Sequence, residues 1–132
     1  MTKRTKILLV EPDKFLAEAY QKALAAAGYD VVLATGAQDA IHEADQQTPD
    51  LIILELQMAG HNGLEFLYEF RSYPEWQRVP VIINSLVPPT ETDENIVFWD
   101  YLNISAHLYK PRTTLSQLIY AAENCLSPAL KQ

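Results

Sequence analysis

Short apolar runs recur along the chain at regular intervals. Each run is continuous instead of alternating with polar residues, which is typical of strands buried on both faces of a sheet. The pattern therefore predicts five short strands in the interior of the molecule. The five runs are Ile7–Val10, Val31–Ala34, Leu51–Leu54, Val79–Ile83 and Ala106–Tyr109.

The segments between these runs have the length of helices, and their apolar residues recur with a period of about 3.6. Serine, threonine and glutamine at fixed spacing indicate where such helices begin, and glycine or proline indicates where they end. We expect helices from about Lys14 to Ala27 before a capping Gly28, from a capping box of Thr35 and Gln38 to about Gln47, from just after Gly63 to about Tyr73, within Asp93 to Leu102, and after Pro111 with a capping box of Thr114 and Gln117.

Strict alternation of strand and helix predicts right-handed crossovers and a parallel sheet with helices on both faces. The expected fold is therefore a doubly wound, five-stranded α/β domain of the flavodoxin-like (βα)5 type. A length of 132 residues fits a single domain, with a core of about residues 5–126 and a tail at 127–132. The connection from Ser85 to Glu94 contains Pro88 and Pro89, which predicts a long loop.

Composition narrows the classes of partner. The chain has 10 Lys and Arg against 17 Asp and Glu, a formal net charge of −7. It lacks the surplus of cations that nucleic acid or an anionic membrane surface requires, so neither is expected as a direct partner. The single cysteine, Cys125, cannot form an intramolecular disulfide, which fits a cytoplasmic protein. No apolar run is long enough to predict a membrane span.

Several polar residues come directly after predicted strands. In an open parallel sheet the ligand crevice lies beyond the carboxyl ends of the strands, so these residues are candidates for a site. Because residues 23–70 contain no Lys or Arg, Lys110 is expected to pair with the nearby carboxylates. The candidates are Glu11, Asp13, Glu55, Ser85 and Lys110.

Four motifs in this order resemble the response-regulator receiver domain of two-component signalling. They are Lys6–Asp13, Pro49–Gly63, Pro80–Ser85 and Ala106–Pro111, and the resemblance covers roughly residues 5–126. It implies that Glu55 stands at the phosphoacceptor position and that Glu11 and Pro12 stand where a pair of acids holds Mg²⁺. It also implies phosphoryl contacts from Ser85 and Lys110, a cis peptide bond before Pro111, and His107 at the aromatic switch position.

Two departures from the family pattern concern the chemistry. Glu55 replaces an aspartate, and the added methylene moves the carboxylate outward by about 1.5 Å, where an error of about 1 Å can cost roughly 10²-fold in rate. Pro12 removes one carboxylate from the metal site. Asp13 either substitutes as a metal ligand or caps the first helix. Mg²⁺ is therefore expected to bind weakly or not at all. If it binds, its ligands would be Glu11, Asp13, Glu55 and the Gln57 carbonyl.

The expected function is that of an atypical, stand-alone receiver domain, a pseudo-receiver that is not an enzyme and whose phosphorylation is impaired or absent. Glu55 either simply pairs with Lys110 or imitates the phosphorylated state by reaching Ser85 and Lys110. The alternatives are a receiver that still accepts phosphate on Glu55 with Mg²⁺, or a flavodoxin-like binder of a small ligand. The last is disfavoured because Glu11 and Asp13 would repel an anionic cofactor.

A protein is the expected partner. Trp99 and Tyr101 give the fourth helix more apolar surface than one buried face absorbs, so they either pack mostly on the sheet or form an exposed aromatic anchor for a partner, to which Tyr109 of the last predicted strand would add. The resemblance points to the face formed by the fourth helix, fifth strand and fifth helix, where a kinase, an output protein or a second copy of the chain would bind. For His107 a structural role is favoured over a role as a pH sensor.

Overall fold

The structure is a computed structural model that describes residues 4–58, 62–89 and 102–127. The helix expected within Asp93 to Leu102 lies outside these residues except for Leu102, and so do Trp99 and Tyr101. Of the expected tail, only Ser127 is described. Among the described residues, no helix has the length and apolar character needed to cross a membrane.

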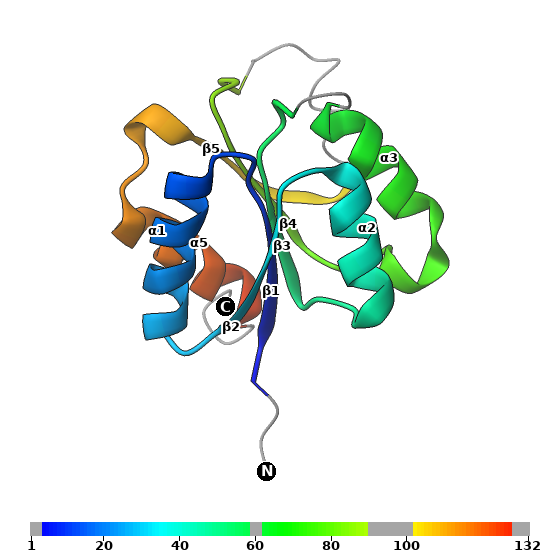
Figure 1. Ribbon diagram of the computed structural model, residues 1–132, viewed down its shortest axis with the longest axis horizontal. Coiled ribbons are helices and arrows are strands. Elements are labelled where there is room, and N and C mark those ends of the chain that lie inside the picture. Colours follow the sequence, from blue (N-terminus) through cyan, green and yellow to red (C-terminus); the bar gives the residue numbers. More distant parts are fainter. Residues whose placement is uncertain (1–3, 59–61, 90–101, 128–132) are drawn as a thin grey trace.

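The strands form one parallel sheet in the order β2-β1-β3-β4-β5, which confirms the predicted doubly wound topology (Figure 1). Chain order reverses between β1 and β3, because β2 lies on one side of β1 and all later strands lie on the other. The carboxyl ends of β1 and β3 therefore flank the switch point at which ligands bind in such sheets. The strands are β1 Lys6–Val10, β2 Asp30–Ala34, β3 Leu51–Leu54, β4 Val81–Ser85 and β5 Ile104–Tyr109.

Helices cover both faces of the sheet: α2 and α3 on one face and α1 and α5 on the other (Figure 1). Alternate strand residues enter two separate cores, one with Phe66 and Phe70 of α3 and one with Leu24 of α1 and Leu118 of α5. This two-sided burial explains why the strand segments are apolar without alternation. The described helices are α1 Lys14–Ala26, α2 Ala37–Gln46, α3 Gly63–Ser72 and α5 Leu115–Leu126, with 3₁₀ turns η1 Pro74–Trp76 and η2 Lys110–Arg112.

One of the two predicted capping boxes forms. At α5, Gln117 N donates to Thr114 Oγ1 at 3.1 Å, and Thr114 N donates to Gln117 Oε1 at 2.8 Å. At α2 the prediction is wrong, because the helix begins at Ala37 and its N-cap is Gly36, which has no side chain to accept a hydrogen bond. Thr35 lies one residue too early, and its hydroxyl donates to Asp39 Oδ2 instead.

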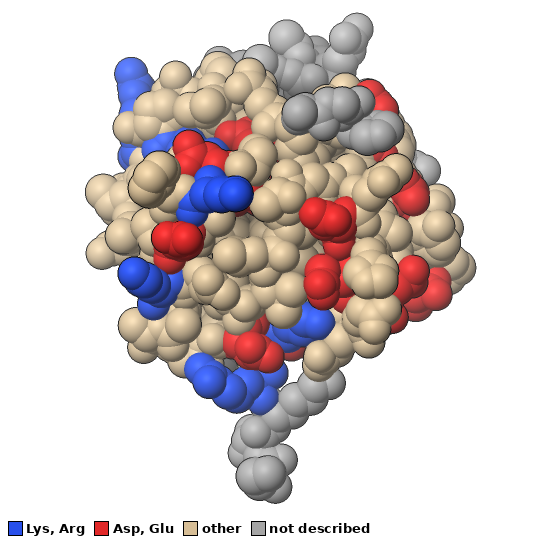
Figure 2. Space-filling model, in the orientation of Figure 1, with Lys and Arg blue, Asp and Glu red and all other residues tan. Residues whose placement is uncertain are grey.

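Charge is distributed unevenly over the surface. On the face drawn in Figure 2, acidic side chains gather over α2 and α3, whereas the visible Lys and Arg lie over α1, near the turn after β5 and toward the amino ends of the strands. This follows from the absence of Lys and Arg between residues 23 and 70, the part of the chain that supplies α2 and most of α3.

Candidate functional site

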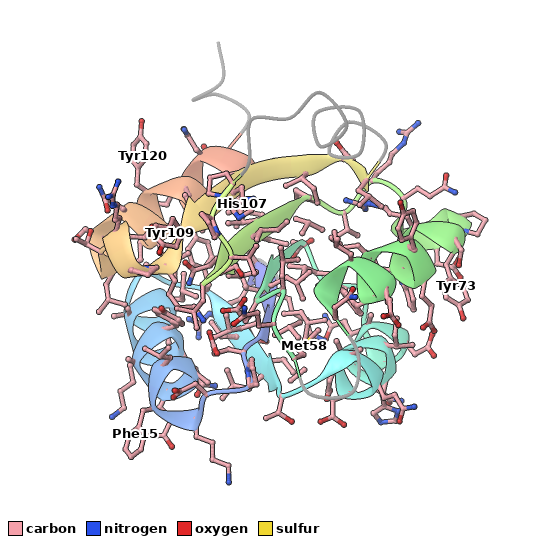
Figure 3. All side chains as sticks on the ribbon, turned by 90° about the horizontal axis from the view of Figure 1, so that it is seen from above. Phe15, Met58, Tyr73, His107, Tyr109 and Tyr120 are labelled. Atoms are coloured by element: carbon pink, nitrogen blue, oxygen red, sulfur yellow. The ribbon has the colours of Figure 1, made fainter. Side chains whose placement is uncertain are left out.

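The candidate residues meet at the carboxyl edge of the sheet. Val10 and Leu54 are register partners, so Glu11 and Glu55 follow aligned positions on neighbouring strands. Ser85 ends β4, and Lys110 follows the last residue of β5. Figure 3 looks down onto this edge, with His107 and Tyr109 on the β5 side and Met58 beyond the end of β3. Glu11, Glu55 and Ser85 are all buried, with exposed fractions of 3%, 3% and 0%.

Lys110 forms two short ion pairs in this buried setting. Its Nζ lies 2.6 Å from Glu11 Oε1 and 2.7 Å from Glu55 Oε1. Burial by itself would lower the pKa of Lys110, but the hydrogen bonds and charges of the two glutamates outweigh it and hold this pKa above its usual value. The ammonium therefore stays charged, and the predicted pairing of Lys110 with the rim carboxylates is confirmed.

Each oxygen of the Glu55 carboxylate accepts two hydrogen bonds. Its Oε1 accepts from Lys110 Nζ and, at 3.1 Å, from the Leu86 backbone N–H. Its Oε2 accepts from the Ser85 hydroxyl and, at 3.0 Å, from the Gln57 backbone N–H. Burial would raise the pKa of Glu55, but these donors, Lys110 and Ser85 first, hold it below its ordinary range. The carboxylate is thus ionised, with both oxygens fully engaged.

A chain of hydrogen bonds leads from Glu55 to β5. Ser85 donates to Glu55 and accepts from Val87 N at 2.9 Å, while the Val87 carbonyl accepts from His107 Nε2 at 2.8 Å. Because a carbonyl can only accept, the proton of this bond belongs to His107 Nε2. Burial lowers the pKa of His107, although the Val87 carbonyl and the charge of Glu55 act in the opposite direction. Glu55, just after β3, is therefore linked to β5 through Ser85 at the end of β4 and Val87 beyond it.

Asp13 acts as the helix cap, which settles one of the open alternatives. Its Oδ1 accepts from Leu16 N at 3.1 Å, and it is the N-cap of α1. Its own N–H donates to Glu11 Oε2 at 3.0 Å, so the backbone at this turn faces Glu11 while the carboxylate faces the helix. Asp13 therefore does not substitute for the acid that is absent at Pro12.

The residues at this edge do not fit the Mg²⁺ that the family resemblance implies. Mg²⁺ prefers a near-octahedral set of oxygen ligands. Here Glu11 and Glu55 both contact the Lys110 ammonium, Pro12 has no carboxylate, and Asp13 is turned toward α1. Within residues 4–58, 62–89 and 102–127, no group of three His, Cys, Asp or Glu is placed to hold a metal ion.

The expected cis bond before Pro111 is wrong, because the Lys110–Pro111 peptide bond is trans. Pro111 lies in the first positions of the 3₁₀ turn η2, which Thr113 N closes onto the Lys110 carbonyl at 3.2 Å. A proline tolerates such a position because its missing N–H is not needed there. With this bond trans, the Lys110 ammonium contacts both glutamates.

Gly63, expected only as the residue before a helix, also belongs to this site. Its N–H donates to the Leu56 carbonyl at 2.8 Å, and a Cβ added to it would lie 2.8 Å from Leu56 Cα and 3.1 Å from the Glu55 carbonyl oxygen. Only glycine lets α3 approach the segment after β3 this closely. A helix that opens on glycine soon after a buried strand is the signal that could have identified it.

The expected partner face is described in part. Tyr109 is half-buried, while Tyr120 of α5 is 65% exposed (Figure 3). A groove between β5 and α5 is lined in part by Ala106, Leu108 and Ala121, with Tyr120 among its polar neighbours. An apolar floor with a tyrosine at the rim is typical of a surface that binds protein.

Comparison with known proteins gives a consistent result. Residues 7–120 match the family model described as the response regulator receiver domain. The KDP operon transcriptional regulatory protein KdpE of Escherichia coli (strain K12) is 36% identical over 81 residues, which is 61% of this chain and 35% of KdpE. The probable transcriptional regulator ycf29 of Pyropia yezoensis is 32% identical over 106 residues, which is 80% of this chain and 46% of that protein. The chain thus spans less than half the length of these curated relatives.

Solved structures share the fold over nearly the whole chain. The chemotaxis protein CheY4 of Vibrio cholerae superimposes with a TM-score of 0.83 at 21% identity, covering 94% of this chain and all of CheY4. The phosphorylated cyanobacterial phytochrome response regulator RcpA superimposes with a TM-score of 0.75 at 29% identity, covering 96% of each chain. The family match over residues 7–120, on a five-stranded parallel sheet of this order, shows that the chain belongs to the response regulator receiver domain family.

Proposed function

We propose that this chain is a receiver domain of two-component signalling that acts in the cytoplasm as a protein-interaction module. In this proposal it has no enzymatic activity, and phosphorylation does not control its conformational state. The observation that carries the proposal is the state of the Glu55 carboxylate. Both of its oxygens already accept two hydrogen bonds, from Lys110, Ser85 and two backbone N–H groups.

Phosphoryl transfer requires an oxygen of the acceptor to approach phosphorus in line with the leaving group. For Glu55, either oxygen would first have to give up its donors, and this costs more in a buried site than in water. The added methylene also shifts the oxygen from the position that an aspartate would give it. These features support a receiver that is held in one state by its own carboxylate.

The partner of such a module is expected to be a protein. The names of KdpE and ycf29 describe them as transcriptional regulators, and receiver domains work with kinases and output proteins. For this chain we expect a kinase, an output protein or a second copy to bind the face formed by β5 and α5. The apolar floor of the groove at Leu108 and the exposed Tyr120 support that placement.

Intact mass spectrometry after incubation with acetyl phosphate and Mg²⁺ tests the proposal. We expect the wild-type chain to gain no stoichiometric phosphoryl adduct. The double variant Pro12→Asp with Glu55→Asp is expected to gain one that depends on Mg²⁺, because it restores both a metal-ligating carboxylate and the shorter acceptor. The two single variants are the matched controls, since each restores only one of these groups.

A stoichiometric adduct on the wild-type chain that disappears in Glu55→Gln would overturn the proposal. It would instead favour a receiver that still accepts phosphate on Glu55. An adduct that persists in Glu55→Gln reports modification at another residue and leaves Glu55 out of the chemistry.

A further inference from the structure

The position of the Lys110 ammonium bears on the metal that the family pattern implies. One nitrogen contacts Glu11 Oε1 at 2.6 Å and Glu55 Oε1 at 2.7 Å, and all three side chains are at least nine-tenths buried. A divalent cation bridging these two oxygens would need the volume that this nitrogen fills. It would also have to approach a positive charge inside a site that excludes most water.

The remaining oxygens of the two carboxylates are also engaged. Glu11 Oε2 accepts from Asp13 N at 3.0 Å, and Glu55 Oε2 accepts from Ser85 and from Gln57 N. A metal would therefore have to displace the ammonium from one side of the pair or hydrogen-bond donors from the other. Pro12 offers no carboxylate to compensate for either loss.

The charge balance makes the ammonium necessary. Two buried carboxylates and one ammonium leave a charge of about −1, which the Ser85 hydroxyl and the backbone donors disperse. Without Lys110 the two carboxylates would face each other without a counter-ion. Adjacent buried carboxylates in that state take up a proton or a cation.

We propose that Lys110 is the resident cation of this site: it holds the place between Glu11 and Glu55 that a divalent metal would need, so the wild-type chain does not bind Mg²⁺ there, and loss of Lys110 opens a divalent-cation site. This inference deepens the proposed function, because it assigns the counter-ion of the same carboxylates. It explains how the site keeps one arrangement whatever the Mg²⁺ concentration.

Titration with Mn²⁺ tests the inference, with the electron paramagnetic resonance signal of free Mn²⁺ as the readout. We expect wild-type protein to leave the signal of free Mn²⁺ unchanged. Lys110→Met should bind one equivalent of Mn²⁺, with an affinity at least about tenfold higher than that of wild-type protein. Adding Glu11→Gln to Lys110→Met should abolish the gain. Lys22→Met is the matched control, because it removes the same charge from an exposed position in α1.

Circular dichroism establishes that each variant is folded. If Lys110→Met does not fold, Lys110→Gln takes its place, because its amide still donates to one carboxylate. Wild-type protein that depletes Mn²⁺ as strongly as the Lys110 variants would overturn the inference, and so would folded Lys110 variants that deplete none. Wild-type binding of Mn²⁺ without a phosphoryl adduct would overturn this inference alone, whereas an adduct without Mn²⁺ binding would overturn the proposed function alone.

Discussion

The Ser85 hydroxyl is a donor and an acceptor at the same time. It donates to Glu55 Oε2 and accepts from Val87 N at 2.9 Å, and the residue is fully buried. Ser85→Ala would remove one donor from a buried carboxylate and leave the Val87 N–H without its acceptor. We expect the free energy of unfolding to fall by about 1–3 kcal/mol, measured by urea denaturation.

Ser72→Ala is the matched control for this substitution. The Ser72 hydroxyl donates to the Glu69 carbonyl at the exposed end of α3, where water replaces a lost partner. Its removal should change the free energy of unfolding by no more than about 0.5 kcal/mol. Equal losses in the two variants would contradict the role given to Ser85.

At the scale of single residues, the sequence predicts contacts between charged side chains better than contacts with the backbone. Lys110 was expected to pair with the rim carboxylates because a long stretch of the chain has no other cation. The N–H of Leu86 and the carbonyl of Val87 were not expected to take part, because every residue has such groups and only the path of the chain selects them. For Asp13 the sequence left two roles open, and the geometry of the turn decides between them.

At the scale of elements, two threonines share the sequence pattern of a helix cap, but only one of them caps a helix. Thr114 caps α5 with a reciprocal pair of hydrogen bonds, whereas Thr35 lies outside the N-cap of α2 and contacts Asp39. Thr114→Ala is expected to lower the free energy of unfolding by about 1 kcal/mol. Thr35→Ala is expected to change it by less than about 0.5 kcal/mol.

Thermal and urea unfolding of both variants provide the measurement, with helix content checked by circular dichroism. A loss for Thr35→Ala as large as that for Thr114→Ala would show that Thr35 contributes to the start of α2 after all. The comparison is informative because both residues occupy the same S/T-x-x-Q sequence pattern.

The strands were predictable because burial on both faces leaves a continuous apolar run, and all five appear near the expected positions. Their ends were less predictable. Val79 was expected to open β4, but its N–H donates to the Trp76 carbonyl in the preceding turn, and the strand begins only at Val81 after Pro80. Apolar character indicates burial, and hydrogen bonding decides whether a buried residue belongs to a strand.

At the scale of the whole molecule, the topology accounts for the meeting of residues that are far apart in sequence. The order β2-β1-β3-β4-β5 places Glu11, Glu55, Ser85 and Lys110 at one edge, as the alternation of strands and helices predicted. The net charge of −7 disfavours nucleic acid and anionic membranes as direct partners but does not indicate this site. The informative acids are the two that are buried against Lys110, whereas the acids over α2 and α3 lie on the surface (Figure 2).

The balance of the buried groups determines how the stability of the molecule responds to acid. The pKa of Glu55 in the folded chain lies below its ordinary value of 4.5, so the unfolded chain binds more protons as the pH falls through this range. The stabilisation is therefore complete above about pH 4.5 and is lost as the pH falls through the lowered pKa. The pKa of His107 is also lowered, from 6.5, so a separate loss begins near pH 6.5.

Urea denaturation between pH 7.5 and pH 3 is expected to show both losses in the wild-type chain. In Glu55→Gln the loss below about pH 4.5 should become shallower. The loss that begins near pH 6.5 should persist, because burial still lowers the pKa of His107 and the variant removes a charge that raises it. Asp45→Asn, an exposed acid of α2, is the control and should keep the wild-type profile. If Glu55→Gln kept the full wild-type slope below pH 4.5, the loss of stability in that range would come from a residue other than Glu55, the carboxylate that pairs with Lys110.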